Sequence, residues 1–269
     1  MNIKHSFFML FALPFLAACE QDRIPDTCHD SPKYCINLHE DSWCRAEREI
    51  LIDARQAHTR DADDAQAYTL MVALQDYQQC LEPLLTMEYT RRKERKEQKL
   101  NAIMDAKEHL AQLTERTQDS DYPYLLLWRW QHQADHQAKA RFITLAERPD
   151  MRQAMLQKNL AKFLMARDSE AAEIALQRAL ALSQHEAELD TDIIAQLIAL
   201  YVRQQDYQKV WVWSRVFNQL KAEETVDLAR MDSYTTFSAS EQQTMQVQVE
   251  RLIEQLTHQD YKLPAKAAW

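Results

Sequence analysis

The sequence predicts an all-α protein in which antiparallel helical hairpins stack as a short solenoid. Its 269 residues contain no glycine, the residue that reaches left-handed backbone angles most easily. Tight β-hairpins, phosphate-binding loops, dinucleotide fingerprints and nucleophile elbows depend on glycine, so its absence argues against most enzyme folds that a sequence reveals. Apolar residues also recur at three- and four-residue spacing along the chain, which is the pattern of one helix face.

Three regions at the amino end are typical of a secretory signal. Lys4 supplies the charged start, residues 7–18 form the apolar centre, and Ala17 and Ala18 are the small residues before Cys19. The apolar centre has about a dozen residues, whereas a helix that spans a bilayer needs roughly 20. We therefore expect residues 1–18 to be a cleaved signal, and an uncleaved membrane helix is the weaker interpretation.

Residues 16–19, Leu-Ala-Ala-Cys, resemble the lipobox of bacterial lipoproteins. The resemblance implies cleavage after Ala18, attachment of a diacylglycerol to the Cys19 thiol, and acylation of the new amino group. Because Glu20 rather than Asp follows the cysteine, it also implies anchoring in the outer membrane, on the periplasmic face. Three acyl chains exceed the single chain that binds a membrane only marginally. The alternative is a cleaved, unanchored protein with an unmodified Cys19.

The charge balance excludes one class of partner. Removing residues 1–18 from the 269 leaves 251 residues, enough for one elongated domain or two small ones. Of the 32 Lys and Arg only Lys4 is lost, so 31 basic side chains stand against 41 acidic ones, a formal net charge of −10. Nucleic-acid binding needs a basic footprint, so we expect no nucleic-acid partner.

Four cysteines remain after Cys19, namely Cys28, Cys35, Cys44 and Cys80. An even number in an oxidising compartment predicts disulfides, which would fasten the linker at residues 19–40 to the first helices. Three pairings are open, and spacing does not choose among them. Free or mixed thiols are one alternative. A metal site with His29 and His39 is another, although the chain has no Cys-x-x-Cys pair.

Region 41–147 is expected to form the first helices. A helix is predicted from about Ser42, with an apolar stripe at Trp43, Ala46, Ile50, Ala54 and Ala57. Asp64 is expected to cap the next helix, and Pro83 to end it. A further helix is predicted over residues 84–117, with an apolar face at Leu100, Ile103, Met104, Leu110 and Leu113.

The run R-R-K-E-R-K-E-Q-K at residues 91–99 lies inside that predicted helix. As a basic patch it would bind anionic headgroups or an acidic partner. As a solvated helix section it would pair its basic side chains with Glu94 and Glu97. We favour the solvated section.

A helix predicted over residues 124–146 carries the one helical histidine pair. His132 and His136 are four residues apart and would share one face, a spacing that binds zinc in metalloproteases. Gln133 stands where the general-base glutamate would follow the first histidine, and the sequence supplies no third ligand. We therefore expect solvated or capping histidines, no metal, and no catalytic residue.

Region 148–222 has the most regular pattern. The predicted helices are 150–166, 169–183, 191–204 and 206–220, with caps at Ser169, Thr191 and Asp206 and a capping box of Asp150 with Gln153. Ala175 and Val210 hold equivalent places, 35 residues apart.

This regular region resembles the tetratricopeptide repeat, whose period is 34 residues, although the glycine and proline positions of that repeat are not matched. The resemblance implies a partner groove on the first helix of each hairpin. The groove residues would be Asn159, Lys162, Arg167, Gln196, Ala199 and Arg203. Two hairpins do not make a stable solenoid alone, so the upstream helices are expected to complete it.

The last hairpin helix is apolar nearly all round. Trp211 and Trp213 point about 200° apart on it, so two helices sandwich it or one tryptophan faces a partner, and we favour the sandwich. Region 223–258 holds C-terminal helices, the last opened by Ser240 with Gln243. We expect the tail at 259–269 to be loose unless Trp269 docks.

No motif in the chain assigns an activity. The whole chain is similar to a group of bacterial lipoproteins classed only as a domain of unknown function, and that resemblance implies no activity. We expect a non-catalytic, lipid-anchored interaction module, without a cofactor, that binds a periplasmic or outer-membrane protein. The alternatives are a structural envelope lipoprotein without a dedicated partner, and a metal-dependent hydrolase that uses His132 and His136.

Overall fold

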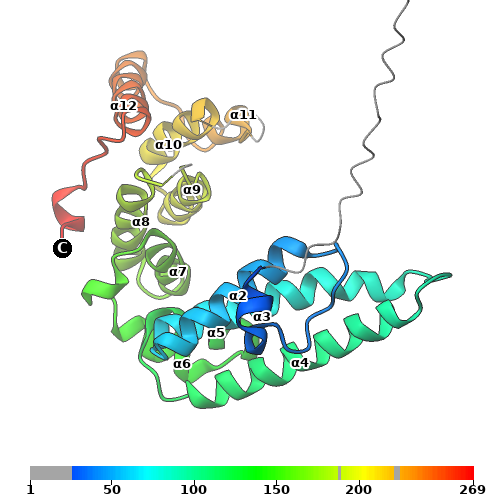
Figure 1. The fold of residues 1–269 in the computed structure, drawn as a ribbon. Helices are drawn as coiled ribbons and strands as arrows, with labels where there is room; N and C mark the ends of the chain where they lie inside the picture. The colour runs from blue at the N-terminus through cyan, green and yellow to red at the C-terminus, as the bar shows by residue number, and fades with distance from the viewer. Residues whose placement is uncertain (1–25, 187–188, 221–224) are drawn as a thin grey trace, which may run out of the picture. The chain divides into compact units, whose positions relative to one another are not determined.

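The computed structural model describes residues 26–186, 189–220 and 225–269 (Figure 1). The predicted signal peptide and Cys19 lie outside these residues. The described residues contain twelve α-helices and four short 3-10 helices and no strand, which confirms the all-α prediction. None of these helices combines the length and the apolar character needed to cross a bilayer. The chain divides into two compact units after Gln118, so the predicted boundary at 147/148 falls inside the second unit.

The first unit is built on α2 (Arg45–Arg60), α3 (Asp64–Leu81) and α4 (Glu94–Arg116). α3 packs against both of the other helices. Their shared core consists of large apolar side chains, among them Leu51, Ile52, Leu70, Leu74, Tyr77, Ile103 and Leu113. The short elements of this unit are α1 (Asp26–Asp30), η1 (Pro32–Cys35) and η2 (Glu82–Thr86).

Two disulfides fasten the start of this unit. Cys28 is bonded to Cys35, and Cys44, just before α2, is bonded to Cys80 near the end of α3. The prediction that these four cysteines form disulfides is confirmed. The prediction that the bonds fasten residues 19–40 to the first helices is wrong, because Cys28 and Cys35 both lie within that segment and Cys44–Cys80 joins the start of α2 to α3. A cysteine binds a metal through its thiolate. All four of these sulfurs are in disulfides, so the alternative of a metal site at these cysteines is wrong.

α2 buries only part of its predicted apolar stripe: Ala54 is buried and Ala57 is partly buried, but the stripe's large side chains are not. Trp43 and Ile50 are 50% and 57% exposed. Arg48 is buried instead, and its guanidinium donates to the backbone oxygens of His39 (2.7 Å) and Asp41 (2.8 Å). A buried charge requires such acceptors, and they come from the segment before the helix, which a periodicity count does not see.

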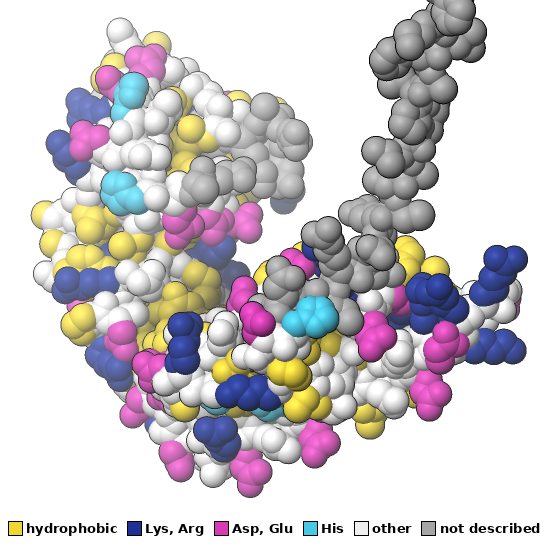
Figure 2. Space-filling view, viewed as in Figure 1, with side chains coloured by type: hydrophobic (Ala, Val, Ile, Leu, Met, Phe, Trp, Pro, Cys, Tyr) yellow, Lys and Arg dark blue, Asp and Glu magenta, His cyan; other side chains and the backbone are white. Residues whose placement is uncertain are grey.

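α4 begins later than the predicted helix at 84–117. Arg92 takes a left-handed φ of 55° before the helix starts at Glu94. Lys and Arg side chains gather on the surface around this start (Figure 2), as expected for a solvated run. The last residue of the run, Lys99, is an exception, because it is fully buried while Leu100 and Met104 are exposed.

The helix predicted over residues 124–146 is two helices, α5 (Pro123–Gln133) and α6 (His136–Thr144). Ala134 ends α5 with a left-handed φ of 52°. Asp135 then caps α6 by accepting the backbone N–H groups of Gln137 and Ala138. His132 and His136 consequently lie on different helices, and the prediction that they share one helix face is wrong.

The second unit continues as a series of helices (Figure 1). The series comprises η3 (Pro149–Met151), α7 (Ala154–Leu164), α8 (Ser169–Ser183), α9 (Asp192–Gln204) and α10 (Tyr207–Leu220), followed by α11 (Leu228–Asp232), α12 (Ala239–Thr257) and η4 (Ala265–Ala267). α6 to α10 each pack against the next, while α11 and α12 both pack against α10. α10 packs against both α9 and α12, and Trp211 and Trp213 are buried. The predicted sandwich is confirmed.

Several caps differ from the predicted ones by one or two residues. Asp206 accepts the N–H of Lys209 (3.2 Å) at the start of α10, as predicted. The other caps are Asp63 for α3 and Asp168 for α8, with a capping box of Ser238 and Glu241 for α12. Asp150 pairs with Arg148 instead of forming a capping box, and Thr191 makes no side-chain cap.

The lack of glycine forces other residues into left-handed backbone angles. Among the described residues these are Asn37, Cys44, Arg92, Ala134, Gln205 and Gln259. Each costs about 1–2 kcal/mol relative to a right-handed angle. The turns between helices are thus made at a local cost that the packing of the helices offsets.

We predict that Ala134→Gly raises the free energy of unfolding by about 0.5–1 kcal/mol, because relief of the left-handed angle exceeds the added chain entropy of glycine. The matched control is Ala140→Gly on the exposed face of α6, where glycine costs about 1 kcal/mol. Urea unfolding followed by tryptophan fluorescence measures both, since five of the six tryptophans lie in the second unit. A loss of stability in both variants would contradict the prediction.

Candidate functional sites

The first unit contains a buried polar cluster, formed by His39, Asp41, Arg48, Tyr77 and Lys99. The segment before α2 supplies the first two residues, and α2, α3 and α4 supply one each. All five are at most 5% exposed. The cluster therefore joins every main element of the unit through side chains that are shielded from water.

The hydrogen bonds of the buried cluster define the states of its members. The Lys99 ammonium pairs with the Asp41 carboxylate. His39 Nε2 lies 2.5 Å from the carbonyl oxygen of Trp43, and Nδ1 lies 2.6 Å from the Tyr77 hydroxyl. Because a carbonyl only accepts, Nε2 carries the proton, and Nδ1 accepts from the tyrosine.

The pKa values agree with a neutral His39 and Tyr77. Burial lowers the pKa of His39 below its ordinary value and raises the pKa of Tyr77 to about 12. No member of the cluster lines the pocket between α2 and α3 or the pocket between η1, α2 and α4 that are described below. The cluster thus holds the segment before α2 in place rather than presenting groups to a ligand.

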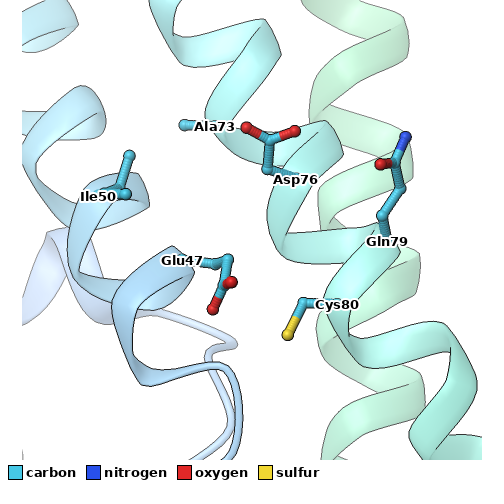
Figure 3. Close-up of a pocket in the computed structure, with 6 residues that line it drawn as sticks. All are labelled: Glu47, Ile50, Ala73, Asp76, Gln79 and Cys80. Carbon is cyan, nitrogen blue, oxygen red and sulfur yellow. The ribbon is translucent and has the colours of Figure 1, made fainter. Parts of the chain in front are cut away.

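A pocket of about 500 Å³ lies between α2 and α3 (Figure 3). Glu47 on α2 points across toward Cys80 on α3, and Asp76 adds a second carboxylate. The ligand atoms of Cys44, Glu47 and Cys80 lie within 4.8 Å of one another. The Cys44 and Cys80 sulfurs are bonded to each other in a disulfide. The pocket therefore offers carboxylates but no thiolate, and it lacks the ligands that soft metal ions prefer.

A second pocket, of about 350 Å³, opens between η1, α2 and α4. It is the more basic of the two. Its lining includes the basic side chains Lys33, Arg55 and Arg116, the histidines His58 and His109, and the single carboxylate of Asp105. This composition is unusual for a chain with a formal net charge of −9.

In the second unit the tail (residues 259–269) runs back from α12 to α8 (Figure 1). Tyr261 N–H donates to Gln184 Oε1 (2.6 Å), and the Gln184 amide donates to Tyr261 O (3.2 Å). Arg178 donates to the backbone oxygens of Ala267 (3.0 Å) and Ala268 (2.9 Å). Tyr261 is buried, so the prediction of a loose tail is wrong.

Charged and aromatic contacts complete the docking of the tail. The Lys266 ammonium lies 2.8 Å from the Glu173 carboxylate on α8. Burial acts to raise the pKa of Glu173, but Lys266 and Lys209 outweigh it, so this pKa lies below its ordinary value. The Trp269 ring lies 4.0 Å from the Arg178 guanidinium carbon. Docking of the terminal tryptophan, the alternative to a loose tail, is therefore what the structure shows.

The two histidines whose spacing raised the zinc alternative make other contacts. His132 stacks on Trp128, with ring centroids 4.6 Å apart, and its Nδ1 lies 2.9 Å from the Trp128 carbonyl oxygen. His136 packs edge-on against Trp130. In the part of the chain that the structure describes, neither histidine joins a group of three metal-ligating residues.

The predicted groove residues lie on or next to α7 and α9 rather than on α8, and the groove stays a prediction. Lys162, Arg167, Ala199 and Arg203 are exposed, Gln196 is partly buried, and Asn159 is buried. The Asn159 amide donates to the carbonyl oxygen of Met155 (2.8 Å), so it is committed to its own helix.

Sequence reasoning missed the buried cluster and the residues of α8. One signal was available, because Lys99 stands in helical register with Ala102, Ile103 and Ala106, which are all buried. A lysine at the spacing of buried apolar residues predicts a buried ion pair only when its acidic partner is known. The partner here, Asp41, lies 58 residues away in the sequence, so the pattern did not reveal the pair. The polar residues of α8 gave no signal, since polar side chains on a helix are usually solvated.

We predict that Lys99→Met lowers the free energy of unfolding by about 3–5 kcal/mol, because it leaves the Asp41 carboxylate buried without its partner. The matched control is Lys96→Met, three residues earlier on the same helix and exposed, which should change stability by less than about 0.5 kcal/mol. Hydrogen exchange of α3 and α4 amides measures both. Equal protection in the two variants would show that the pair does not hold the unit together.

Comparison with known proteins gives one match. Residues 16–215 match the family described as "Protein of unknown function (DUF2989)". No curated protein and no solved structure matches the chain. The family match covers well over half of the 269 residues and spans all four disulfide-bonded cysteines and helices α1 to α9. The chain therefore belongs to this family of proteins of unknown function.

Proposed function

We propose that the chain is a lipid-anchored module on the periplasmic face of the outer membrane, which binds another protein through an extended peptide. The anchor is Cys19, and the lipobox-like residues 16–19 support it. The family match begins at residue 16 and so includes them. Disulfides Cys28–Cys35 and Cys44–Cys80 are typical of a protein outside the reducing cytosol.

The docked tail is the single observation that carries the binding role. α8 holds the tail by donating to and accepting from its backbone, through Gln184 and Arg178. Side chains that bond a backbone accept many peptide sequences, as strand-binding and groove-binding domains do. We infer that the α8 surface (Glu173, Gln177, Arg178 and Gln184) is a peptide-binding face, and that the tail occupies it in the absence of a partner.

The helices α7 to α10 support an interaction role in a second way. Their lengths and order agree with two hairpins of a tetratricopeptide-like repeat, and such repeats present extended binding surfaces. The predicted groove on α7 and α9 and the α8 surface lie on different helices, so a binding experiment separates them.

We predict that a palmitate analogue labels the wild-type protein in cells and does not label Cys19→Ala, because the thiol that receives the lipid is missing. Cys28→Ala, which removes a different cysteine, is the control and should keep the label. Glu20→Asp should shift the labelled protein toward the inner-membrane fraction. Label on Cys19→Ala, or an amino-terminal residue that precedes position 19, would rule out the anchor.

We predict that a synthetic peptide of residues 260–269 binds the chain truncated after Gln259, because truncation frees the α8 surface. Arg178→Met should weaken this binding by at least about tenfold, since it removes charge-assisted bonds to two backbone oxygens. Arg203→Met, in the predicted groove on α9, is the matched control and should leave the affinity within about twofold. Circular dichroism verifies that each truncated variant keeps its helices.

Two outcomes of the peptide measurement would overturn the binding role. If the peptide does not bind the truncated chain, the tail is only a structural part of the second unit. A structural envelope lipoprotein without a dedicated partner would then be the better interpretation. If Arg203→Met weakens binding as much as Arg178→Met, the α7–α9 groove is the binding face.

A further inference from the structure

The basic pocket is the 350 Å³ pocket between η1, α2 and α4. Its walls are held together by Arg55, whose guanidinium donates to the carbonyl oxygens of Tyr34 (3.1 Å) and Ile36 (3.0 Å) and to Asp105 Oδ2 (3.0 Å). Asn37 occupies the other oxygen of Asp105 at 2.7 Å. The only carboxylate among the described residues of the lining is therefore already satisfied.

The remaining charged groups of the basic pocket are positive. Lys33 on η1 and Arg116 at the end of α4 are exposed, and neither pairs with a carboxylate of the lining. Two cations at the mouth of a pocket with no free carboxylate favour an anionic ligand. Arginine also binds phosphate and carboxylate oxygens through paired N–H groups.

Two histidines line the same pocket. His58 Nε2 is buried and has no hydrogen-bond partner among the described residues. Burial, and then Arg116, lower the pKa of His58, and burial, and then Arg55, lower the pKa of His109. A buried polar nitrogen without a partner is costly, and an anion in the pocket would accept a hydrogen bond from Nε2–H and offset that cost.

An exposed apolar side chain also lines the basic pocket. Ile36 lines the pocket and is 57% exposed. Met104, the neighbour of Asp105 on α4, is also exposed. Protein surfaces that lie at the headgroup boundary of a bilayer typically combine basic side chains with exposed apolar side chains.

The distance from the anchor favours a lipid as the source of the anion. Lys33 follows Cys19 by 14 residues, so the pocket lies at most about 50 Å from an acylated Cys19 along the chain. This choice of source rests on the proposed anchor, whereas the anion site itself does not.

We propose that the basic pocket binds the phosphate of an anionic phospholipid headgroup. Lys33 and Arg116 bind the phosphate oxygens, and His58 donates its Nε2–H to one of them. Ile36 contacts the glycerol and the start of the acyl chains. Arg55 is a positioning residue that holds the walls of the pocket through Tyr34, Ile36 and Asp105.

The test is a titration of the full chain carrying Cys19→Ala with dihexanoylphosphatidylglycerol below its micelle concentration. Calorimetry measures the dissociation constant. Lys33→Gln with Arg116→Gln should weaken binding by at least about tenfold. Arg91→Gln with Lys96→Gln removes the same two charges from exposed positions outside the pocket and should change the constant by less than about twofold.

Each outcome of this titration decides between sources. Tight binding of phosphatidylglycerol, weak binding of inorganic phosphate and of dihexanoylphosphatidylcholine, and shifts of the His58 and His109 ring protons on lipid addition are the expected results. Inorganic phosphate that binds as tightly as the lipid would make this a free-phosphate site and overturn the lipid assignment. No binding, or equal weakening by the two charge-removing pairs, would overturn the site. Because this chain lacks the acylation site, these outcomes are independent of the palmitate labelling.

Discussion

The pairing of the Lys99 ammonium with the Asp41 carboxylate determines how the first unit is held together. Removing both charges from water costs several kcal/mol per ion, so the pair forms only where other bonds complete it. The Trp43 N–H completes the Asp41 carboxylate by donating to its Oδ1 (3.2 Å), and Arg48 holds the same segment by donating to the carbonyl oxygens of His39 and Asp41. The segment before α2, which has no regular structure of its own, is thereby fixed by side chains from α2, α3 and α4. Disulfides on both sides limit its movement further.

The absence of glycine is a second constraint, and it acts on the turns. Cys44 precedes α2, Ala134 ends α5 and Gln205 ends α9, each with a φ between 50° and 59°. A chain that avoids glycine loses less entropy when its helices form, but every left-handed turn then carries a side chain that clashes with its own backbone.

Local pattern was sufficient to predict α8, whose bounds of Ser169–Ser183 agree with the predicted helix at 169–183, and the burial of Trp211 and Trp213 on α10. It was insufficient wherever a charged residue is buried. The face of α2 is chosen by Arg48, and that of α4 by Lys99, and both choices depend on acceptors from a distant segment. The basic pocket was equally hidden, because η1, α2 and α4 meet only in three dimensions. Hydrophobic periodicity describes a helix by itself, whereas burial of a charge is a property of the assembled unit.

The chemistry of the docked tail limits which peptides compete with it. Gln184 and Arg178 bind backbone atoms, so they do not distinguish one side chain from another. Selection therefore falls to the side chains of the tail, namely Lys266, which pairs with Glu173, and the two aromatic residues at the ends of the contact. Tyr261 packs against Trp213 with ring centroids 6.5 Å apart, and Trp269 lies over Arg178. A peptide that displaces the tail needs aromatic side chains eight residues apart to recover both contacts, and one with a single aromatic residue would keep the backbone bonds but lose the burial that makes them strong.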